Sequence, residues 1–468
     1  MKKTKIICSI GPSSCNVDVM REMVLSGMNV ARINFSHATI KEREDVVSTV
    51  KKVRSLTNVP VAILYDTKGP EFRNGELENG EITLVKDETI RIVKEEVLGN
   101  NKRFSVNHSS ALDSINVGDI ILLENGLMKI EVISKEEDGI TCLIINGGVL
   151  GNKKSLSVPG VKLDIPFVSK EDLEDITYAC NHDASFLALS FVSSKDDVLE
   201  VKEILKNNNR EDLKIISKIE SATGIENLDE IIEVSDGIMV ARGDLGVEIP
   251  MEELPHTQKL IISRCRHFGK ICIVATEMLE SMKKNIRPTR AEVSDIAYAV
   301  MSGADAVMLS GETTTGKYPI ETVSSMAMVC ESAEKYVKSE VNRNNINKDI
   351  ASAIAASVID TSDIMDAKLI VAATMSGHTA KIISNLRPKS LVLATCPSDE
   401  VARSLMLNYA VYPAVTNIYK NTDEIIFDAK EKAKENFKIE KDDILVITGG
   451  FPNNSKNKIT NFMKIEKM

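Results

Sequence analysis

Tryptophan is absent from this sequence, and aromatic residues make up only 4% of its 468 residues. The core must therefore be built mainly from aliphatic side chains. No apolar run approaches the roughly 20 residues that span a bilayer, so we expect no transmembrane helix. The eight cysteines form no CxxC pair, which argues against a disulfide framework and against a zinc site. The N-terminal residues show no signal-peptide core, and these absences together predict a cytoplasmic protein.

Negatively charged residues outnumber positively charged ones. Lys and Arg total 58 against 68 for Asp and Glu, which gives a formal net charge of −10. A surface for nucleic acid or for an anionic membrane needs a dense cationic face, so we expect neither partner. Apolar residues reach 43%, enough for a folded chain, and the length suggests about three domains.

Short β-branched apolar runs alternate with longer amphipathic segments. The runs lie at Ile6–Gly11, Val30–Phe35, Val61–Asp66, Phe186–Phe191, Ile215–Glu220, Gly237–Arg242, Ile271–Thr276 and Ala306–Gly311. Such alternation, repeated eight times, is typical of a (β/α)8 TIM barrel, and a doubly wound sheet is the main alternative. We therefore predict an α/β protein whose barrel comprises residues 1–69 and 162–343.

The long gap between the third and fourth runs has a different pattern. Residues 70–161 contain short alternating runs separated by Gly and Asn turns, which predicts a small all-β domain inserted in a barrel loop. The expected strands are Glu81–Val85, Thr89–Val93, Ile120–Leu123, Lys129–Ile133 and Thr141–Ile145.

The C-terminal part begins a new strand and helix series. A helix is expected from Pro319 to about Val341, followed by a polar linker at Asn342–Lys348. Residues 344–468 are then predicted to form a separate α/β domain of ordinary size. Its expected strands are Leu369–Ala373, Leu391–Thr395 and Ile444–Thr448.

Charged residues gather where the predicted barrel strands end, which is where a TIM barrel holds its active site. Because side chains alternate along a strand, Lys218 and Glu220 lie on one side of the fifth run. In the second run, Arg32, Asn34 and Ser36 lie on one side for the same reason. Other run ends contribute Asp66, Thr67, Arg73, Asp244 and Thr276.

This combination of cations and carboxylates suits an anion beside a hard metal ion. Two carboxylates and a phosphate commonly hold Mg²⁺, Arg binds phosphate in a bidentate manner, and Lys provides a point charge. A single charged strand end is usually a loop residue or a helix cap, but five of the eight ends carry such residues. The pattern therefore favours metal-assisted phosphoryl transfer.

A near match to the P-loop pattern occurs at Gly311–Tyr318. It fails at Tyr318, where a Ser or Thr would be needed to reach Mg²⁺, and it follows the last barrel strand. We interpret it as a barrel loop that leads into a helix with Pro319 near its first turn.

Several long stretches resemble the pyruvate kinase family and span nearly the whole predicted barrel. They are Thr4–Pro12 (TKIICSIGP), Gly27–His37 (GMNVARINFSH), Asp66–Arg73 (DTKGPEFR), Ile215–Ser221 (IISKIES), Asp236–Pro250 (DGIMVARGDLGVEIP) and Ala275–Pro319. The inserted region is covered through Leu150–Pro159 (LGNKKSLSVP), while the C-terminal part resembles the family's regulatory domain more weakly.

The resemblance implies phosphoryl transfer from phosphoenolpyruvate to ADP, the final step of glycolysis, giving pyruvate and ATP. It assigns Lys218 to the phosphoryl group in transit and Arg32 to the phosphate. Glu220 and Asp244 would bind Mg²⁺ or Mn²⁺. The substrate carboxylate would lie among Gly243, Asp244 and Thr276. Thr276 would also lie near the enolate carbon that is protonated after transfer.

The resemblance also implies K⁺, with the ligands Asn34, Ser36, Asp66 and Thr67. Family members that dispense with K⁺ tend to carry a Lys where this chain has Glu71, so we expect K⁺ dependence. The inserted β domain would close as a lid that excludes water. The residues implied to approach the nucleotide are Asn34, His37, Arg73 and Lys154.

The C-terminal domain would receive an effector phosphate at the loop before a helix, at Thr374, Ser376, Gly377 and Thr379. A capped helix start without a ligand is the alternative. The facing loop, Gly449–Lys456, departs from the sugar-bisphosphate pattern, which leaves the effector's identity open. The family analogy further implies a homotetramer.

Two departures from the family pattern concern the lid and the substrate region. The usual acidic pair is Glu124-Asn125 here, and Ser193-Ser194 follow where a basic residue is usual. Two other functions are alternatives. One is a carbon–carbon lyase acting on phosphoenolpyruvate or an enolate, and the other is a non-catalytic metabolite sensor.

Overall fold

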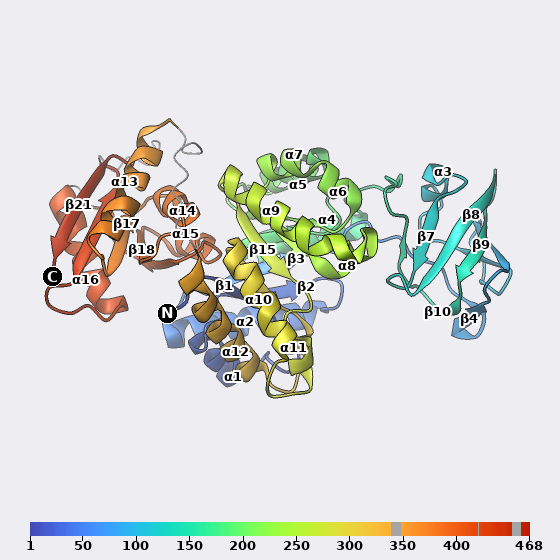
Figure 1. The fold of residues 1–468 in the computed structure, drawn as a ribbon, viewed down its shortest axis with the longest axis horizontal. Helices are drawn as coiled ribbons and strands as arrows, with labels where there is room; N and C mark the ends of the chain where they lie inside the picture. The colour runs from blue at the N-terminus through green and yellow to red at the C-terminus, as the bar shows by residue number, and fades with distance from the viewer. Residues whose placement is uncertain (338–347, 420, 452–459) are drawn as a thin grey trace.

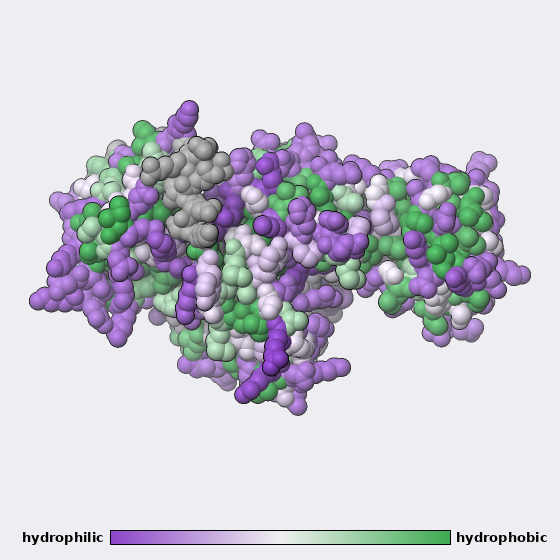
Figure 2. Space-filling view, in the orientation of Figure 1, coloured by the Kyte–Doolittle hydropathy of each residue, from purple (hydrophilic) through white to green (hydrophobic). Residues whose placement is uncertain are grey.

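The computed structural model describes residues 1–337, 348–419, 421–451 and 460–468. Three regions follow one another along its long axis (Figure 1). The barrel lies in the middle, the β-rich region lies at one end and the C-terminal α/β region lies at the other. On the face drawn in Figure 2, hydrophilic residues are interspersed with smaller hydrophobic patches.

Within the described residues, eight parallel strands close into a barrel in the order β1-β16-β15-β14-β13-β12-β3-β2. The eight runs predicted from the sequence supply them, which confirms the TIM barrel over the doubly wound sheet. The strands are β1 (Lys5–Ser9), β2 (Val30–Asn34), β3 (Ala62–Asp66), β12 (Phe186–Leu189), β13 (Lys214–Ile219), β14 (Gly237–Ala241), β15 (Ile271–Ala275) and β16 (Ala306–Leu309).

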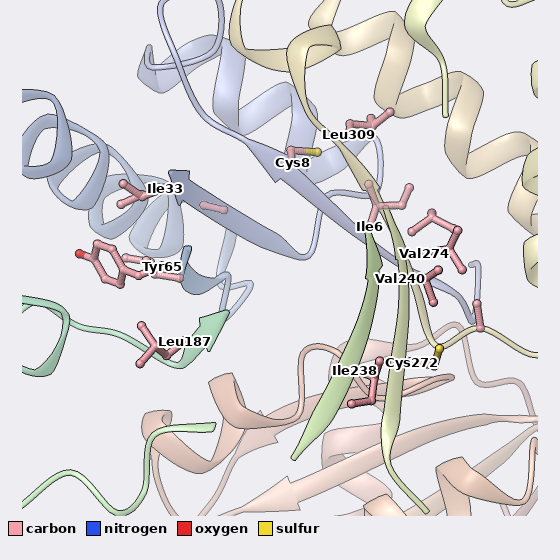
Figure 3. Close-up of a cluster of buried hydrophobic side chains, with 14 of the residues drawn as sticks. Ile6, Cys8, Ile33, Tyr65, Leu187, Ile238, Val240, Cys272, Val274 and Leu309 are labelled. Atoms are coloured by element: carbon pink, nitrogen blue, oxygen red, sulfur yellow. The ribbon is translucent and has the colours of Figure 1, made fainter. Parts of the chain in front are cut away.

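Alternate residues of each barrel strand face opposite ways. Ile6 and Ile33 belong to the cluster packed against the surrounding helices, together with the other side chains labelled in Figure 3. Leu64, Ile216 and Met239 belong to a second cluster inside the barrel. Residues two positions beyond Leu64 and Ile216 continue the interior row, so the same alternation aims Asp66 and Lys218 into the mouth of the barrel.

Helices surround the barrel, and some of them begin with a side-chain N-cap. Ser169 and Thr289, for example, form capping boxes with Asp172 and Glu292. The helices are α1 (Val17–Leu25), α2 (Ile40–Thr57), α4 (Lys170–Asn181), α5 (Lys195–Asn207), α6 (Ala222–Glu226), α7 (Leu228–Val234), α8 (Arg242–Glu248), α9 (Leu254–Phe268), α10 (Arg290–Ser302), α11 (Gly311–Thr314) and α12 (Pro319–Ala333). Short 3₁₀ turns are η2 (Met251–Glu253), η3 (Glu280–Lys283) and η4 (Glu334–Tyr336).

Several element ends differ from the sequence prediction by one to three residues, and two differences change the assignment. Arg242 does not end the sixth strand but begins α8, because the backbone leaves the extended conformation at Ala241. The helix that starts at Pro319 ends at Ala333, and Val337 is extended, so a continuous helix to Val341 was wrong. The predicted linker Asn342–Lys348 lies outside the described residues except for its last position. The P-loop-like segment forms α11 and leads to Pro319 at the start of α12, as expected.

The β-rich region has its own sheet and its own buried cluster, which includes Ile92, Phe104 and Ile130. The predicted runs here are strands, and the structure adds the short β6, β10 and β11. The elements are η1 (Glu78–Gly80), β4 (Glu81–Leu84), β5 (Thr89–Val93), β6 (Arg103–Ser105), α3 (Ala111–Ser114), β7 (Ile120–Leu123), β8 (Met128–Glu136), β9 (Gly139–Asn146), β10 (Gly148–Gly151) and β11 (Leu156–Ser157).

The C-terminal region is a sheet of order β19-β18-β17-β20-β21 flanked by helices. The three predicted strands are present, and the edge strands β19 and β21 were not predicted. Its elements are α13 (Ile350–Ile364), β17 (Leu369–Ala373), α14 (His378–Asn385), β18 (Leu391–Cys396), α15 (Asp399–Ser404), β19 (Val411–Val415), α16 (Thr422–Asn436), β20 (Ile444–Gly449) and β21 (Phe462–Lys467).

The barrel and the C-terminal region are joined by buried polar contacts. Arg387 donates to both carboxylate oxygens of Asp305, just before β16, at 2.9 and 3.0 Å. Lys5 Nζ donates to the carbonyl of Val411 at 2.5 Å. In the parts of the chain that the structure describes, no helix has both the length and the apolar character needed to cross a membrane.

Candidate active site

A buried network of charges fills the mouth of the barrel. Asp66, at the end of β3, accepts a hydrogen bond from Arg32 Nε at 2.7 Å and one from Lys218 Nζ at 3.1 Å. Lys218 Nζ also lies 3.0 Å from Glu220 Oε1. Three strands far apart in the sequence thus bring alternating cations and carboxylates together, as the alternation predicted.

The network fixes its own charge states. Burial opposes ionisation of Asp66, but the Arg32 and Lys218 cations outweigh it and hold the pKa of Asp66 below its ordinary value. Burial alone would lower the pKa of Lys218, yet the carboxylates of Asp66 and Glu220 raise it above its ordinary value. Lys218 is therefore a permanent cation at neutral pH.

The pKa values of Glu220 and Asp244, which both line the cavity at the barrel mouth, are raised. Burial, opposed by Lys218 and reinforced by the Asp244 charge, raises the pKa of Glu220 to about 7. Burial also raises the pKa of Asp244, and Asp66 and Glu71 add repulsion while Lys218 opposes them. A divalent cation would favour the ionised form of both carboxyl groups, and their oxygen atoms are the ligands that such a cation takes.

Two carboxylates alone do not make a complete metal site. Among the described residues, no group of three or more His, Cys, Asp and Glu side chains is placed to hold a metal ion. Mg²⁺ bound through one or two carboxylates takes its other ligands from substrate phosphate and water. Glu220 and Asp244 fit that arrangement.

Thr276 has an unusual backbone at the end of β15. Its φ is 70° and that of Glu277 is 53°, a left-handed conformation that a β-branched residue adopts only when its surroundings impose it. Thr276 Oγ1 accepts from the Gly243 N–H at 2.8 Å and donates to the Ala275 carbonyl at 2.6 Å. The structure thus brings Gly243, Asp244 and Thr276 to one rim, with Asp244 on helix α8 rather than on a strand.

Two hydroxyl groups that contact the charged network were not predicted from the sequence. Ser190 Oγ accepts from Lys218 Nζ at 2.7 Å and donates to the Thr67 carbonyl at 2.7 Å. Ser9 Oγ accepts from Arg32 Nη1 at 2.7 Å. Both follow the rule that polar strand ends line the site, but a neutral Ser gives a weaker signal than a charge.

The proposed K⁺ ligands lie around the end of β2 and β3. Asn34 pairs in register with Asp66, and its side-chain Oδ1 accepts from the Ser36 N–H at 3.0 Å. Thr67 is buried, and its Oγ1 accepts from the Ser190 N–H at 3.3 Å. His37, expected to approach the nucleotide, is exposed on the following turn.

A cavity of about 450 Å³ lies between the β-rich region and the barrel mouth. Arg73 and Lys154 line it from the β-rich side, and Glu220 and Asp244 line it from the barrel side. Arg73 is held by both oxygens of Glu71, at 2.9 and 2.7 Å. Lys154 Nζ donates to Glu124 at 2.7 Å. Glu220 thus belongs both to the buried network and to the cavity wall.

Other residues join the two sides of this cavity. Ser157 Oγ, in β11, donates to the carboxylate of Glu248 in α8.

The two departures from the family pattern make local hydrogen bonds. At the first, the Asn125 Oδ1 accepts from Ser155 Oγ at 2.9 Å. Ser193 Oγ donates to the carboxylate of Asp197 at 3.0 Å, next to Ser194, the N-cap residue of α5.

The expected effector loop lies between β17 and α14. Ser376 is exposed and Gly377 has a φ of 84°, which suits a turn into the helix. Thr374 is buried. Thr379 is buried as well, and its hydroxyl pairs with that of Thr460 at 2.7 Å, so this side chain is engaged within the fold. Residues 452–456 of the facing loop lie outside the described residues.

Comparison with known proteins agrees with this arrangement. The family model "Pyruvate kinase, barrel domain" matches residues 1–323, and "Pyruvate kinase, alpha/beta domain" matches residues 352–466. The chain belongs to the pyruvate kinase family. Membership makes it a phosphotransferase and implies a divalent metal and K⁺ as cofactors.

Similar proteins cover nearly all of the chain. A pyruvate kinase of Staphylococcus haemolyticus is 42% identical over 99% of this chain and 80% of its own length. A pyruvate kinase of Clostridium acetobutylicum is 39% identical over 100% of this chain and 99% of its own. The crystal structure of a pyruvate kinase from Cryptosporidium parvum superposes with a TM-score of 0.95 at 38% identity, covering 100% of this chain and 96% of the other.

Proposed function

We propose that the barrel mouth transfers the phosphoryl group of phosphoenolpyruvate to ADP, giving pyruvate and ATP, as the last step of glycolysis. The observation that carries the proposal is the buried Arg32–Asp66–Lys218–Glu220 network, which reaches the cavity through Glu220. The family membership supports this substrate pair.

Lys218 is the proposed cation for the phosphoryl group in transit. Its ammonium is fixed by Asp66, Glu220 and Ser190, so it needs little reorganisation when negative charge moves past it. Arg32 is proposed to contact the phosphate. Its Nε and Nη1 are engaged by Asp66 and Ser9, an arrangement that orients the guanidinium.

Glu220 and Asp244 are the proposed ligands of Mg²⁺ or Mn²⁺. When bound, the divalent ion neutralises phosphate charge and orients the substrate. The two carboxylates hold it at the cavity wall, close to the Lys218 ammonium.

The substrate carboxylate is proposed to lie among Gly243, Asp244 and Thr276. The Gly243 N–H, which donates to Thr276 Oγ1 in the structure, lies at the start of α8, where the positive end of a helix favours an anion. Thr276 Oγ1 is the proposed hydroxyl near the enolate carbon, which takes up a proton after phosphoryl transfer.

Asn34, Ser36, Asp66 and Thr67 are the proposed K⁺ ligands, and all of them offer oxygen atoms. The proposed nucleotide contacts are Asn34 and the exposed His37, together with two cations of the cavity wall. These cations are Arg73 and Lys154.

The domain roles are part of the proposal. Residues 1–69 and 162–343 form the catalytic barrel, residues 70–161 form the lid, and residues 344–468 form a regulatory domain. The effector site at Thr374, Ser376, Gly377 and Thr379, the homotetramer and the cytoplasmic location are proposed from family analogy.

A coupled assay tests the reaction directly. Purified protein is mixed with phosphoenolpyruvate, ADP, Mg²⁺ and K⁺, and ATP and pyruvate are both measured. Equal amounts of the two products are expected. Consumption of phosphoenolpyruvate without ATP formation would instead indicate a lyase, and no consumption at all would indicate a non-catalytic metabolite sensor.

A further inference from the structure

The left-handed backbone of Thr276 needs a structural cause. A threonine with φ near 70° persists only where neighbouring groups hold it, and the next residue is left-handed too. The side chain of Thr276 bonds to Ala275 and Gly243, which fixes its rotamer. Another group must hold the carbonyls on either side of this bend.

The guanidinium of Arg242 contacts both of these carbonyls. Its Nη2 donates to the Thr276 carbonyl at 2.6 Å, and its Nε lies 3.3 Å from the Ala275 carbonyl. Nη2 is also 2.9 Å from the sulfur of Met278, two residues further along. One planar guanidinium therefore contacts the chain before, at and after the bend.

Asp295 orients the guanidinium from the opposite side. Both of its carboxylate oxygens accept from Arg242 Nη1, at 2.8 and 2.6 Å. The Arg242 side chain is 9% exposed and that of Asp295 is 36% exposed. Gln258 Oε1 lies 3.5 Å from Arg242 Nη1. The pair thus joins α8, α9 and α10 to the end of β15.

The contacts form a closed circuit. The Arg242 side chain holds the Thr276 backbone, and the Thr276 side chain accepts from the N–H of Gly243, the residue after Arg242. We propose that Arg242, oriented by Asp295, is a positioning residue that sets where Thr276 Oγ1 and the Gly243 N–H meet the substrate carboxylate. This role rests on the proposed function.

Lysine cannot reproduce the contact, because a single ammonium lacks the planar fork that spans two carbonyls and a carboxylate. Arg242→Lys therefore keeps the charge but frees the bend. We expect the specificity constant for phosphoenolpyruvate to fall at least about 10-fold, as misplaced reacting groups do. The Michaelis constant for ADP should stay within about twofold, because Arg242 lies outside the residues proposed for the nucleotide.

A second readout follows proton transfer. Protonation of the enolate carbon is reversible: a methyl C–H bond of pyruvate breaks, the proton leaves to solvent, and a deuteron from D₂O takes its place. NMR follows this exchange without ADP turnover. Arg242→Lys should slow it, because Thr276 Oγ1 is no longer held in place, whereas a purely structural role leaves the exchange rate unchanged.

Asp295→Asn and Arg264→Met complete the design. Asp295→Asn should shift the same constants in the same direction but less, and it remains informative if Arg242→Lys folds poorly. Arg264 pairs with Asp229 on the surface in a similar two-bond geometry and serves as the matched control. Arg264→Met should leave the specificity constant for phosphoenolpyruvate, the Michaelis constant for ADP and the exchange rate within about twofold of wild type.

The outcomes separate the two proposals. Arg242→Lys and Asp295→Asn proteins that fold but retain wild-type phosphoenolpyruvate kinetics and wild-type exchange overturn the positioning role. Wild-type protein that makes no ATP overturns the proposed function itself, whatever the variants do.

Discussion

Breaking the Arg387–Asp305 pair, where the C-terminal region meets the barrel, should be strongly destabilising. The two side chains are 1% and 5% exposed and share two parallel hydrogen bonds of 2.9 and 3.0 Å. Arg387 also donates to the carbonyls of Gly303 and Ser384, at 2.6 and 3.0 Å. Removing one partner of such a pair leaves the other charge buried and uncompensated.

We therefore expect Arg387→Met to lower the free energy of unfolding by about 3–5 kcal/mol. Asp305→Asn should cost somewhat less, because an amide oxygen can still accept from the Cys272 N–H, which now lies 2.9 Å from the carboxylate. The double variant should cost less than the sum of the two, with a coupling of about 1–3 kcal/mol.

Urea unfolding followed by far-UV circular dichroism measures the cycle. The exposed Arg264–Asp229 pair, taken through Arg264→Met and Asp229→Asn, is the matched control and should couple by about 0–1 kcal/mol. If the buried pair couples no more strongly than this surface pair, burial does not strengthen the Arg387–Asp305 interaction.

Two further predictions concern the site. The pKa of Glu220 is raised to about 7 in the folded protein, so the protonated carboxyl favours folding at low pH and this stability is lost as the pH rises through the folded pKa. Glutamine does not titrate. In the absence of divalent cations, the free energy of unfolding of Glu220→Gln should therefore rise by roughly 3 kcal/mol relative to that of wild type between pH 4.5 and 7. Urea unfolding at several pH values tests this, and a constant difference contradicts it; Glu171→Gln is the control, since the Lys68 hydrogen bond holds the pKa of Glu171 below 4.5, outside the window. Glu71 cannot supply the positive charge that a Lys at this position would offer in place of K⁺, so activity should require K⁺. Equal rates with K⁺ and with a non-activating counter-ion would contradict this requirement.

Much of the barrel and its charged centre could be predicted because both depend on a local period. Alternation along a strand aims every second residue inward, so Asp66 and Lys218 could be placed beside one another from strand ends alone. The same rule placed Glu220 next to Lys218, and their contact of 3.0 Å confirms it. Strand β19 was missed because Pro413 interrupts its pattern, and an edge strand tolerates that proline.

The rest of the site depends on contacts between distant segments. Asp244 lies on a helix because α8 begins at Arg242, directly after a strand, with no turn signal between them. The left-handed Thr276 is imposed by Arg242 and Gly243 across the rim, which no local propensity encodes. Ser190 and Ser9 gain their importance only from the cations that they contact.

Lys218→Met is the sharpest test of whether the Lys218 ammonium stabilises the phosphoryl group during transfer. Lys214→Met, on the same strand but at the opposite end of the barrel, is the control, because Lys214 pairs only loosely with Asp236 at 3.6 Å. ATP formation is measured in a coupled assay, and Mn²⁺ binding is measured by electron paramagnetic resonance. We expect Lys218→Met to fold, to retain Mn²⁺ binding and to lose turnover by about 10²-fold or more, while Lys214→Met stays near wild type. Near-normal turnover in Lys218→Met would show that this ammonium does not stabilise the phosphoryl group.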